Sequence, residues 1–322
     1  MYGSLLVPLD GSSFAEQALP LAAEICSRSG AVLHLVLVHD SLAAVPVYGE
    51  PVFLDQSIER ASRQREADYL EAVARPFIGH GIVVRTRLLE GPVAHALVGY
   101  ARTSGIELVV LTTHGRGVFS RFWIGSVADR LVRQLEVPML VLRPHAPRGA
   151  PPASLLRRIV VPLDGSPLAE AVLEPATQLG GLLGAEFILY RAVVVLPPMH
   201  LPYPAVMLVP EQTEVTSVLE QQAAQYLDDL AKGLRARGLH VETAVEVTTD
   251  PVAALSTWSE RHGADLIALA THGHGGATRL LLGSVADKLL RSASVPLFVW
   301  RPDGGADRGS TGSRAGAVAV AT

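Results

Sequence analysis

Cysteine is almost absent from this chain of 322 residues. Cys26 is the single one, so no disulfide can form within the chain and a disulfide scaffold is excluded. Its apolar helical surroundings favour a packed side chain over a reactive thiol. Charged residues are also sparse, at 18 %, and the net charge is −4 without a basic stripe. This composition argues against nucleic acid as the main partner.

A long uninterrupted apolar run is missing as well. The most lipophilic stretch, residues 193–210, is broken by prolines at positions 197, 198, 202, 204 and 210. Because proline disrupts a helix interior, this stretch predicts a loop and not a membrane-spanning helix. The amino terminus has no basic segment followed by an apolar core, so no signal peptide is expected. We therefore expect a cytoplasmic protein without a membrane span.

What the chain does have is a long internal repeat. The string VPLDGS occurs at residues 7–12 and again at 161–166. The strings THG and GSVAD occur at 113–115 and 125–129 and return in the same order at 271–273 and 283–287. A period this long indicates two whole domains instead of short stacked units. We predict a first domain (1–144), a proline-rich linker (145–156), a second domain (157–302) and a disordered tail (303–322).

Each copy alternates short apolar runs with longer amphipathic stretches. This rhythm predicts an α/β fold whose parallel sheet is buried on both faces. The expected strands are 4–9, 32–38, 82–89, 108–112 and 138–142 in the first copy, and 158–163, 186–194, 240–247, 266–270 and 296–300 in the second. The expected helices include 14–29, 56–79, 93–103 and 127–135.

The VPLDGS motif places Asp10, or Asp164 in the second copy, directly after an expected strand and before an expected helix. Open parallel sheets bind their ligands at this end of the strands. A carboxylate there suits a ribose hydroxyl, a purine amine or a metal ion. The alternative is structural, with Asp10 and Ser12 accepting hydrogen bonds from the first N–H groups of the next helix.

The second motif leads from a glycine-containing loop into a helix that opens with Gly125-Ser126. Backbone N–H groups in such a loop and at a helix start can bind an anion. Neither copy of the loop contains a lysine, so it is not a P-loop. The alternative is a capping box formed by Ser126 and Asp129. The two interpretations are compatible.

Together, the aspartate after the first strand, the glycine loop after the fourth and the Gly-Ser helix start resemble the universal stress protein family. The resemblance covers residues 3–144 and 157–302. It implies a Rossmann-like, doubly wound, five-stranded parallel sheet of order 3-2-1-4-5 in each copy. It also implies an intrachain pseudo-dimer in which the fifth strands, within Val137–Leu142 and Val295–Trp300, pair with each other.

ATP-binding members of that family hold adenine and ribose near strands one and two and the phosphates on the glycine loop. The resemblance implies that the nucleotide-binding residues here are Pro8, Asp10, Val38, Thr112, His114, Gly115, Gly125, Ser126 and Val127 in the first copy, and Pro162, Asp164, Ala192, Ala270, His272, Gly273, Gly283, Ser284 and Val285 in the second. ATP would bring Mg²⁺, although no dedicated metal cage is visible in the sequence.

Thr112 and Ala270 depart from the family pattern, which has glycine at this position. If the position needs a positive φ or has no room for a Cβ, nucleotide binding is weakened or lost. If it only ends a strand, alanine is harmless and threonine fits well. The sequence leaves this choice open.

The leading functional interpretation is a stress-response protein that binds ATP or a related adenine nucleotide in one or both copies and acts as a regulator or sensor. The alternative is a nucleotide-free scaffold or chaperone-like protein, for which Thr112, Ala270 and the apolar residues 193–210 are the motivation. ATP hydrolysis is least favoured, because no nucleophile with a paired base is apparent, and no catalytic residue is predicted. Residues 43–54 and 196–210 are candidate lids or partner contacts. Whether two chains also form a homodimer stays open.

Overall fold

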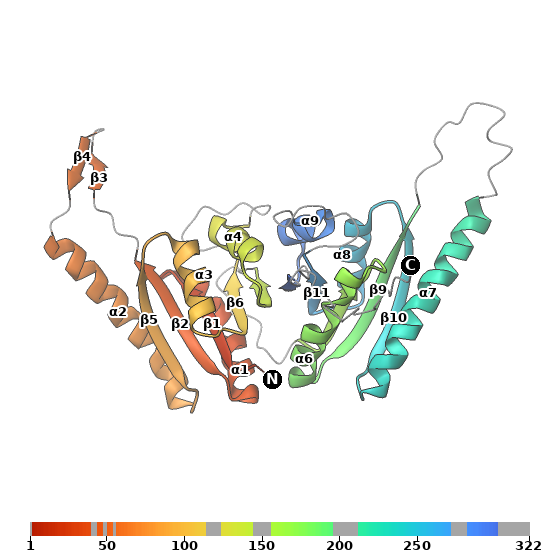
Figure 1. Cartoon of the computed structure of the whole chain (residues 1–322), viewed down its shortest axis with the longest axis horizontal. Helices are drawn as coiled ribbons and strands as arrows, with labels where there is room; N and C mark the ends of the chain where they lie inside the picture. The colour runs from red at the N-terminus through yellow and green to blue at the C-terminus, as the bar shows by residue number, and fades with distance from the viewer. Residues whose placement is uncertain are drawn as a thin grey trace, which may run out of the picture.

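The computed structural model describes residues 2–39, 44–47, 50–53, 56–113, 124–143, 156–195, 212–271 and 282–301. Within these ranges, ten strands form one continuous sheet, and two further strands form a separate ladder (Figure 1). Residues 145–155 of the predicted linker, the predicted tail and the second candidate lid lie outside the described residues. None of the described helices is long and apolar enough to cross a membrane.

The elements of the first copy follow the predicted rhythm. They are β1 (Ser4–Leu9), a 3-10 helix η1 (Ala15–Ala18), α1 (Leu19–Ser29), β2 (Val32–His39), α2 (Gln56–Gly79), β5 (Val84–Glu90), α3 (Val93–Thr103), β6 (Leu108–Thr112), α4 (Ser126–Gln134) and β7 (Met139–Leu142). The second copy contains β8 (Arg158–Pro162), α5 (Pro167–Glu170), α6 (Leu173–Leu183), β9 (Glu186–Val194), α7 (Gln212–Ala236), β10 (Val241–Thr248), α8 (Pro251–Arg261), β11 (Leu266–Ala270), α9 (Ser284–Ser292) and β12 (Leu297–Trp300).

The strand order confirms the predicted topology. The sheet runs β10-β9-β8-β11-β12-β7-β6-β1-β2-β5, so each copy has the order 3-2-1-4-5. Within each copy, all strand pairs of this sheet are parallel. The fifth strands β7 and β12 pair antiparallel, with Leu140 opposite Phe298. The predicted contact between the two fifth strands is therefore confirmed, and the chain forms its own pseudo-dimer.

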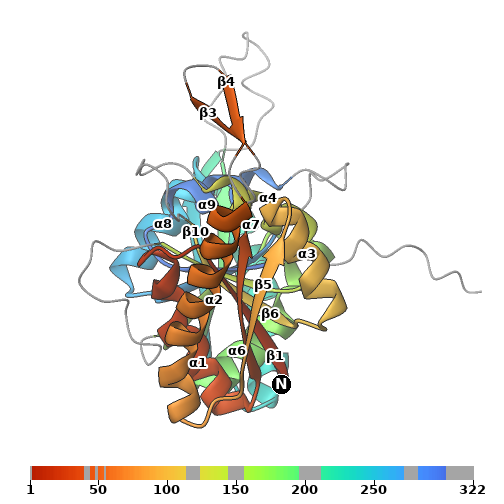
Figure 2. The same ribbon diagram turned by 90° about the vertical axis from the view of Figure 1, so that its left-hand side faces the viewer.

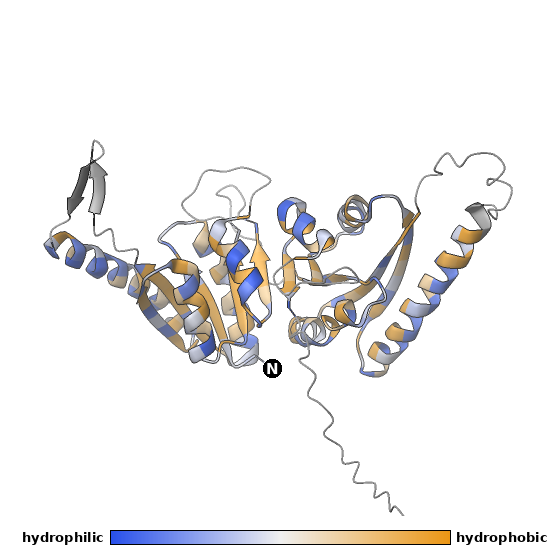
Figure 3. Ribbon diagram, turned by 45° about the horizontal axis from the view of Figure 1, so that its top comes forward, coloured by the Kyte–Doolittle hydropathy of each residue, from blue (hydrophilic) through white to orange (hydrophobic). Residues whose placement is uncertain are grey.

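Both faces of the sheet are covered, which explains why its strands are apolar without alternation. Leu35 faces a core that includes side chains of α1, α2, α6 and α7, whereas the next residue, Val36, faces a core with α3, α4, α8 and α9. Both side chains are fully buried. Figure 3 shows the apolar strands between helices whose exposed faces are hydrophilic. Cys26 is packed into the first of these cores, and burial raises the pKa of its thiol to about 12.

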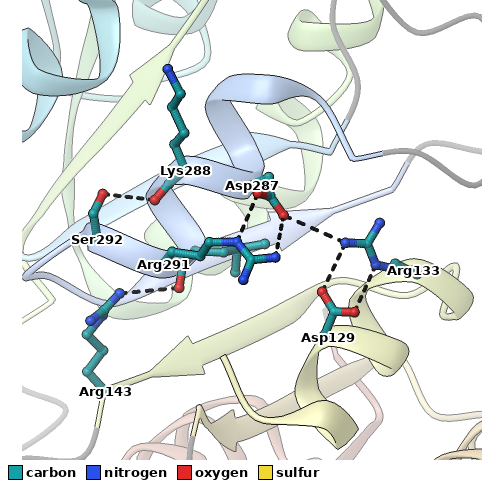
Figure 4. Close-up of polar contacts among 8 residues, drawn as sticks. Asp129, Arg133, Arg143, Asp287, Lys288, Arg291 and Ser292 are labelled. Atoms are coloured by element: carbon teal, nitrogen blue, oxygen red, sulfur yellow. Dashed lines mark hydrogen bonds and ion pairs between the residues drawn. The ribbon is translucent and has the colours of Figure 1, made fainter. Parts of the chain in front are cut away.

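The two copies also meet through polar contacts on α4 and α9 (Figure 4). The guanidinium of Arg133 bonds the carboxylate of Asp129 at 3.0 Å through two nitrogens, and Arg291 bonds Asp287 in the same way at 2.9 and 3.0 Å. Nη2 of Arg133 also lies 3.6 Å from Oδ1 of Asp287, which joins the two copies. Arg291, and more weakly Arg133, lowers the pKa of Asp287.

The sequence patterning does not predict the small ladder of β3 (Ala44–Val47) and β4 (Glu50–Phe53). These strands pair antiparallel with each other and with no strand of the main sheet. Figures 1 and 2 show the ladder standing away from the sheet, above the N-terminal end of α2. It lies within residues 43–54, the first candidate lid, so part of that segment has β structure.

Candidate functional site

Both sequence motifs lie at the switch point of each half-sheet. β1 lies between β2 and β6, and β8 lies between β9 and β11. The first motif follows β1, and η1, which comes after it, contacts β6. The second motif follows β6, where the backbone N–H of Gly125 donates to the carbonyl of Thr113 at 2.7 Å. The two motifs therefore converge at the edge where doubly wound sheets bind ligands.

The first motif forms a turn with a defined hydrogen-bond pattern. Oδ1 of Asp10 accepts from the backbone N–H of Ser12 at 2.9 Å and from its hydroxyl at 2.6 Å. The hydroxyl oxygen of Ser12 in turn accepts from the N–H of Ala15 in η1 at 3.2 Å. Gly11 has a φ of 80°, which favours glycine. Ser12 therefore accepts a hydrogen bond from the first N–H of the next helix, as the structural alternative predicts. Asp10 instead accepts from Ser12 and so fixes the turn.

The second copy repeats this turn closely. Oδ1 of Asp164 accepts from the N–H and hydroxyl of Ser166 at 2.9 and 2.6 Å, and Ser166 caps α5 at Ala169 with 3.1 Å. Gly165 has a φ of 82°. Because the serine fixes one oxygen of each aspartate, the carboxylates are held in place at the ends of β1 and β8. A ligand there would meet a preoriented carboxylate.

The capping-box interpretation of the second motif is wrong. Gly125, and not Ser126, is the N-cap of α4, and glycine has no side chain to accept a hydrogen bond there. Asp129, which a capping box would direct at the helix start, bonds Arg133 through both oxygens instead. α9 repeats the pattern, with Gly283 as an uncapped N-cap. Within the part of the chain that the structure describes, no side chain accepts from the first amides of α4 or α9, which a helix leaves without partners of its own.

Glycine at position 125 has a packing explanation of its own. A Cβ there would lie 2.6 Å from the carbonyl oxygen of Thr113. The φ of Gly125 is −59°, which any residue adopts, so the close approach and not the conformation requires glycine. Gly283 makes the same 2.7 Å hydrogen bond to Thr271. The glycine therefore fixes how closely the helix start approaches the end of the fourth strand.

The structure decides part of the question raised by Thr112 and Ala270. They are the last residues of β6 and β11 and stand in register with Leu142 and Trp300 of the neighbouring strands. Both therefore have extended backbone, and neither position requires a positive φ. The structure therefore excludes the need for a positive φ, while the effect of a Cβ at this position on nucleotide binding stays a prediction.

The other predicted site residues fall into four groups. Pro8 and Pro162 stand in the ladders opposite Val36 and Tyr190. A second set is half-buried at the edge of the core that contains α3, α4, α8 and α9, and it comprises Val38, Val127, Ala192 and Val285. Ser126 and Ser284 are exposed. His114, Gly115, His272 and Gly273 lie outside the described residues.

A buried histidine next to the first cleft was missed by the sequence reasoning. Nδ1 of His39 lies 2.6 Å from Glu66 and Nε2 lies 2.7 Å from Glu59, both on α2. Burial lowers the pKa of His39, but the hydrogen bonds and charges of the two glutamates outweigh it, so the pKa is raised. The histidine ties the end of β2 to α2. Aligning the two copies would have flagged it, because Val193 takes its place in the second.

Arg191 was missed for the same reason. It follows Tyr190 in β9, and Tyr190 pairs with Pro162. In the first copy Leu37 takes the equivalent position, because it follows Val36, which pairs with Pro8. A charged residue inside an otherwise apolar strand is the signal that the sequence offered. Among the described residues, the two copies therefore differ at this strand position beside the Asp-Gly-Ser turn. Among the described residues, no group of three or more His, Cys, Asp and Glu side chains is placed to hold a metal ion.

A sequence profile of the universal stress protein family matches residues 1–143 and again residues 156–301. The chain belongs to the universal stress protein family. Its two matches make it a tandem member. A universal stress protein of Mycobacterium tuberculosis is 31 % identical over 201 residues, which are 61 % of this chain and 62 % of that relative. This alignment thus spans less than two thirds of the relative's length.

Other relatives of this universal stress protein match along nearly the whole chain. One from Mycolicibacterium smegmatis is 25 % identical over 308 residues, covering 94 % of this chain and 97 % of the relative. The crystal structure of a universal stress protein from Archaeoglobus fulgidus superposes with a TM-score of 0.66 at 20 % identity, covering 92 % of this chain and 98 % of that chain. The structural likeness shows a shared tandem fold.

Proposed function

We propose that this universal stress protein binds ATP or a related adenine nucleotide at the switch-point cleft of one or both copies, and acts as a regulator or sensor. One observation carries the proposal. Among the described residues, no side chain caps α4 or α9, whose first residues follow the switch-point strands, whereas α5 and α8 are capped by Ser166 and Asp250. Uncapped amides and the positive end of the helix dipole suit a phosphate group.

The remaining geometry fits the rest of such a ligand. The carboxylates of Asp10 and Asp164 are held at the end of the first strand, where they could accept hydrogen bonds from ribose hydroxyls. Val38 and Ala192 are half-buried beside them and offer an apolar surface for a purine ring. Phosphates bound this way would contact Ser126 or Ser284, and Mg²⁺ would enter with the nucleotide.

A substitution at the helix start can separate binding from folding. Ser126→Glu and Ser284→Glu place a carboxylate in the first turn, where it favours the helix but repels a phosphate. Ser57→Glu puts the same side chain in the first turn of α2, a helix start that belongs to neither sequence motif, and is the matched control. Isothermal titration of the full chain with ATP and Mg²⁺ should give saturable heat for wild type and Ser57→Glu. Affinity should fall about tenfold or more at the substituted cleft.

Two results would overturn the proposal. The first is the absence of heat from the wild-type chain at millimolar nucleotide. The second is binding that survives Ser126→Glu and Ser284→Glu combined, since the nucleotide would then lie elsewhere. Thermal denaturation of each variant shows whether the fold is retained.

A second function is favoured by one surface of α7. Val215, Val218 and Leu219 are spaced to lie on one side of this helix and are 43, 51 and 40 % exposed. Such a stripe suits a protein partner, in keeping with a nucleotide-free interaction role. Val218→Glu should then weaken capture of that partner from cell extract without changing nucleotide binding, and capture unaffected by the substitution would remove this candidate.

A further inference from the structure

Arg191 places a cation beside the second Asp-Gly-Ser turn, at a strand position where the first copy has Leu37. It is half-buried near the end of β9, in the position that Leu37 occupies in β2. Leu37 is 3 % exposed and packs in the core. Repeat symmetry alone therefore does not explain a guanidinium at this position.

The guanidinium is held against the Asp-Gly-Ser turn. Its Cζ lies 4.9 Å from the ring centre of Tyr226, and Nη1 and Nη2 lie 3.0 and 3.3 Å from the position that a Cβ on Gly165 would take. The hydroxyl of Tyr226 donates to Glu170 at 2.8 Å. In the first copy Tyr69 donates to Glu16, also at 2.8 Å. The tyrosine–glutamate hydrogen bond is thus common to both copies, whereas the arginine is found in the second copy and is replaced by Leu37 in the first.

Arg191 has no acceptor within the part of the chain that the structure describes: it forms no hydrogen bond or ion pair there, and its recorded contact is the ring of Tyr226. A half-buried guanidinium presents five N–H donors in a planar fork, and leaving such donors unsatisfied is costly. The usual partner for this fork is a carboxylate or phosphate bound through two oxygens. An anionic ligand would supply it.

The position of Arg191 indicates which part of a ligand carries that anion. β9 and β11 flank β8 on opposite sides, so Arg191 and the α9 start lie at opposite sides of the Asp164 turn. The helix start suits the phosphate chain, and Asp164 suits the ribose. In α/β dinucleotide-binding folds, an arginine near the ribose is the group that accommodates a ribose phosphate.

We propose that the second cleft selects an adenine nucleotide whose ribose carries a phosphate, and that Arg191 contacts that phosphate. The proposal rests on the nucleotide binding proposed above and goes beyond it by naming a ligand class for one cleft. The first cleft, with Leu37, would accept nucleotides without regard to a ribose phosphate.

Two isomeric ligands test this directly. ADP and adenosine 3′,5′-bisphosphate have the same atoms, but the bisphosphate has one of its two phosphates on the ribose. Each is titrated into the full chain, into Arg191→Leu and into Arg261→Leu, which removes an arginine from the last turn of α8 as the matched control. Arg191→Leu should weaken the tighter of the two bisphosphate sites about tenfold or more and change ADP binding by less than about threefold. Arg261→Leu should change neither.

The outcomes separate this proposal from the one it rests on. If neither isomer binds any variant, nucleotide binding itself fails. If ADP binds but Arg191→Leu leaves bisphosphate affinity unchanged, or weakens both isomers equally, the role of Arg191 fails alone. Arg191→Gln, which keeps a polar side chain, repeats the comparison should the leucine variant unfold at a lower temperature than wild type.

Discussion

Gly125→Ala tests whether the motif glycine is needed by the fold itself. The added Cβ would lie 2.6 Å from the carbonyl oxygen of Thr113, a separation that unstrained structures do not show. This oxygen already accepts the N–H of residue 125 at 2.7 Å. The carbonyl can therefore retreat only by weakening that bond, and α4 can retreat only by loosening its packing on the sheet.

The expected magnitude follows from two opposing effects. Overpacking of this kind costs about 1–3 kcal/mol. At a φ of −59° alanine also restricts the unfolded chain, which returns about 0.4–1 kcal/mol. We expect a net loss of about 1–2 kcal/mol, or a Tm lower by roughly 2–8 °C for a unit of this size.

Urea unfolding and thermal denaturation of the nucleotide-free chain are the assays. The matched control is Gly99→Ala in α3, where a Cβ would meet nothing within 4 Å. It should raise the free energy of unfolding by about 0.5–1 kcal/mol, because alanine is the better helix former. Should Gly125→Ala prove as stable as wild type, the close approach would not explain the glycine, and a ligand would have to.

Three further predictions concern other contacts. His39→Gln removes a cation held between two carboxylates, and the pKa of His39 in the folded state lies above its ordinary value of 6.5. The loss of stability relative to wild type should therefore be complete below pH 6.5 and should disappear as the pH rises through the raised pKa. Urea titrations that show the same loss at every pH would contradict this. A double-mutant cycle of Arg133→Gln and Asp287→Asn, measured on the free energy of unfolding, should give a coupling energy of about 0.2–1 kcal/mol that decreases with added salt. A coupling energy of zero at low salt would argue against this contact between the copies. A Cβ on Gly180 would lie 2.2 Å from Cζ of Phe187, so Gly180→Ala should cost about 1–3 kcal/mol in urea unfolding, and an unchanged midpoint would refute tight packing of α6 on β9.

The main elements could be predicted because each has a strong local signal. Runs such as β6 and β11 are almost entirely apolar and lie next to turn residues, so their predicted bounds agree with the structure. The topology needed more than local pattern. It followed from the resemblance, which the profile match and the strand order then confirmed.

The site was less predictable, because its geometry depends on which of several available hydrogen-bond partners each side chain contacts. Asp129 had the spacing of a capping residue, yet Arg133 lies one turn away and binds both carboxylate oxygens. His39 and Arg191 stand in apolar strands, where their partners on α2 and α7 are distant in sequence. The β3–β4 ladder, with two prolines among its residues, lacks the usual composition of strands.

Native mass spectrometry of the full chain tests the central claim most directly. With ATP and Mg²⁺ present, the account predicts a population that carries one or two adenine nucleotides per chain. That population should disappear in the Ser126→Glu, Ser284→Glu double variant and persist in Ser57→Glu. A wild-type chain that stays at its bare mass with millimolar ATP would contradict nucleotide binding at these clefts.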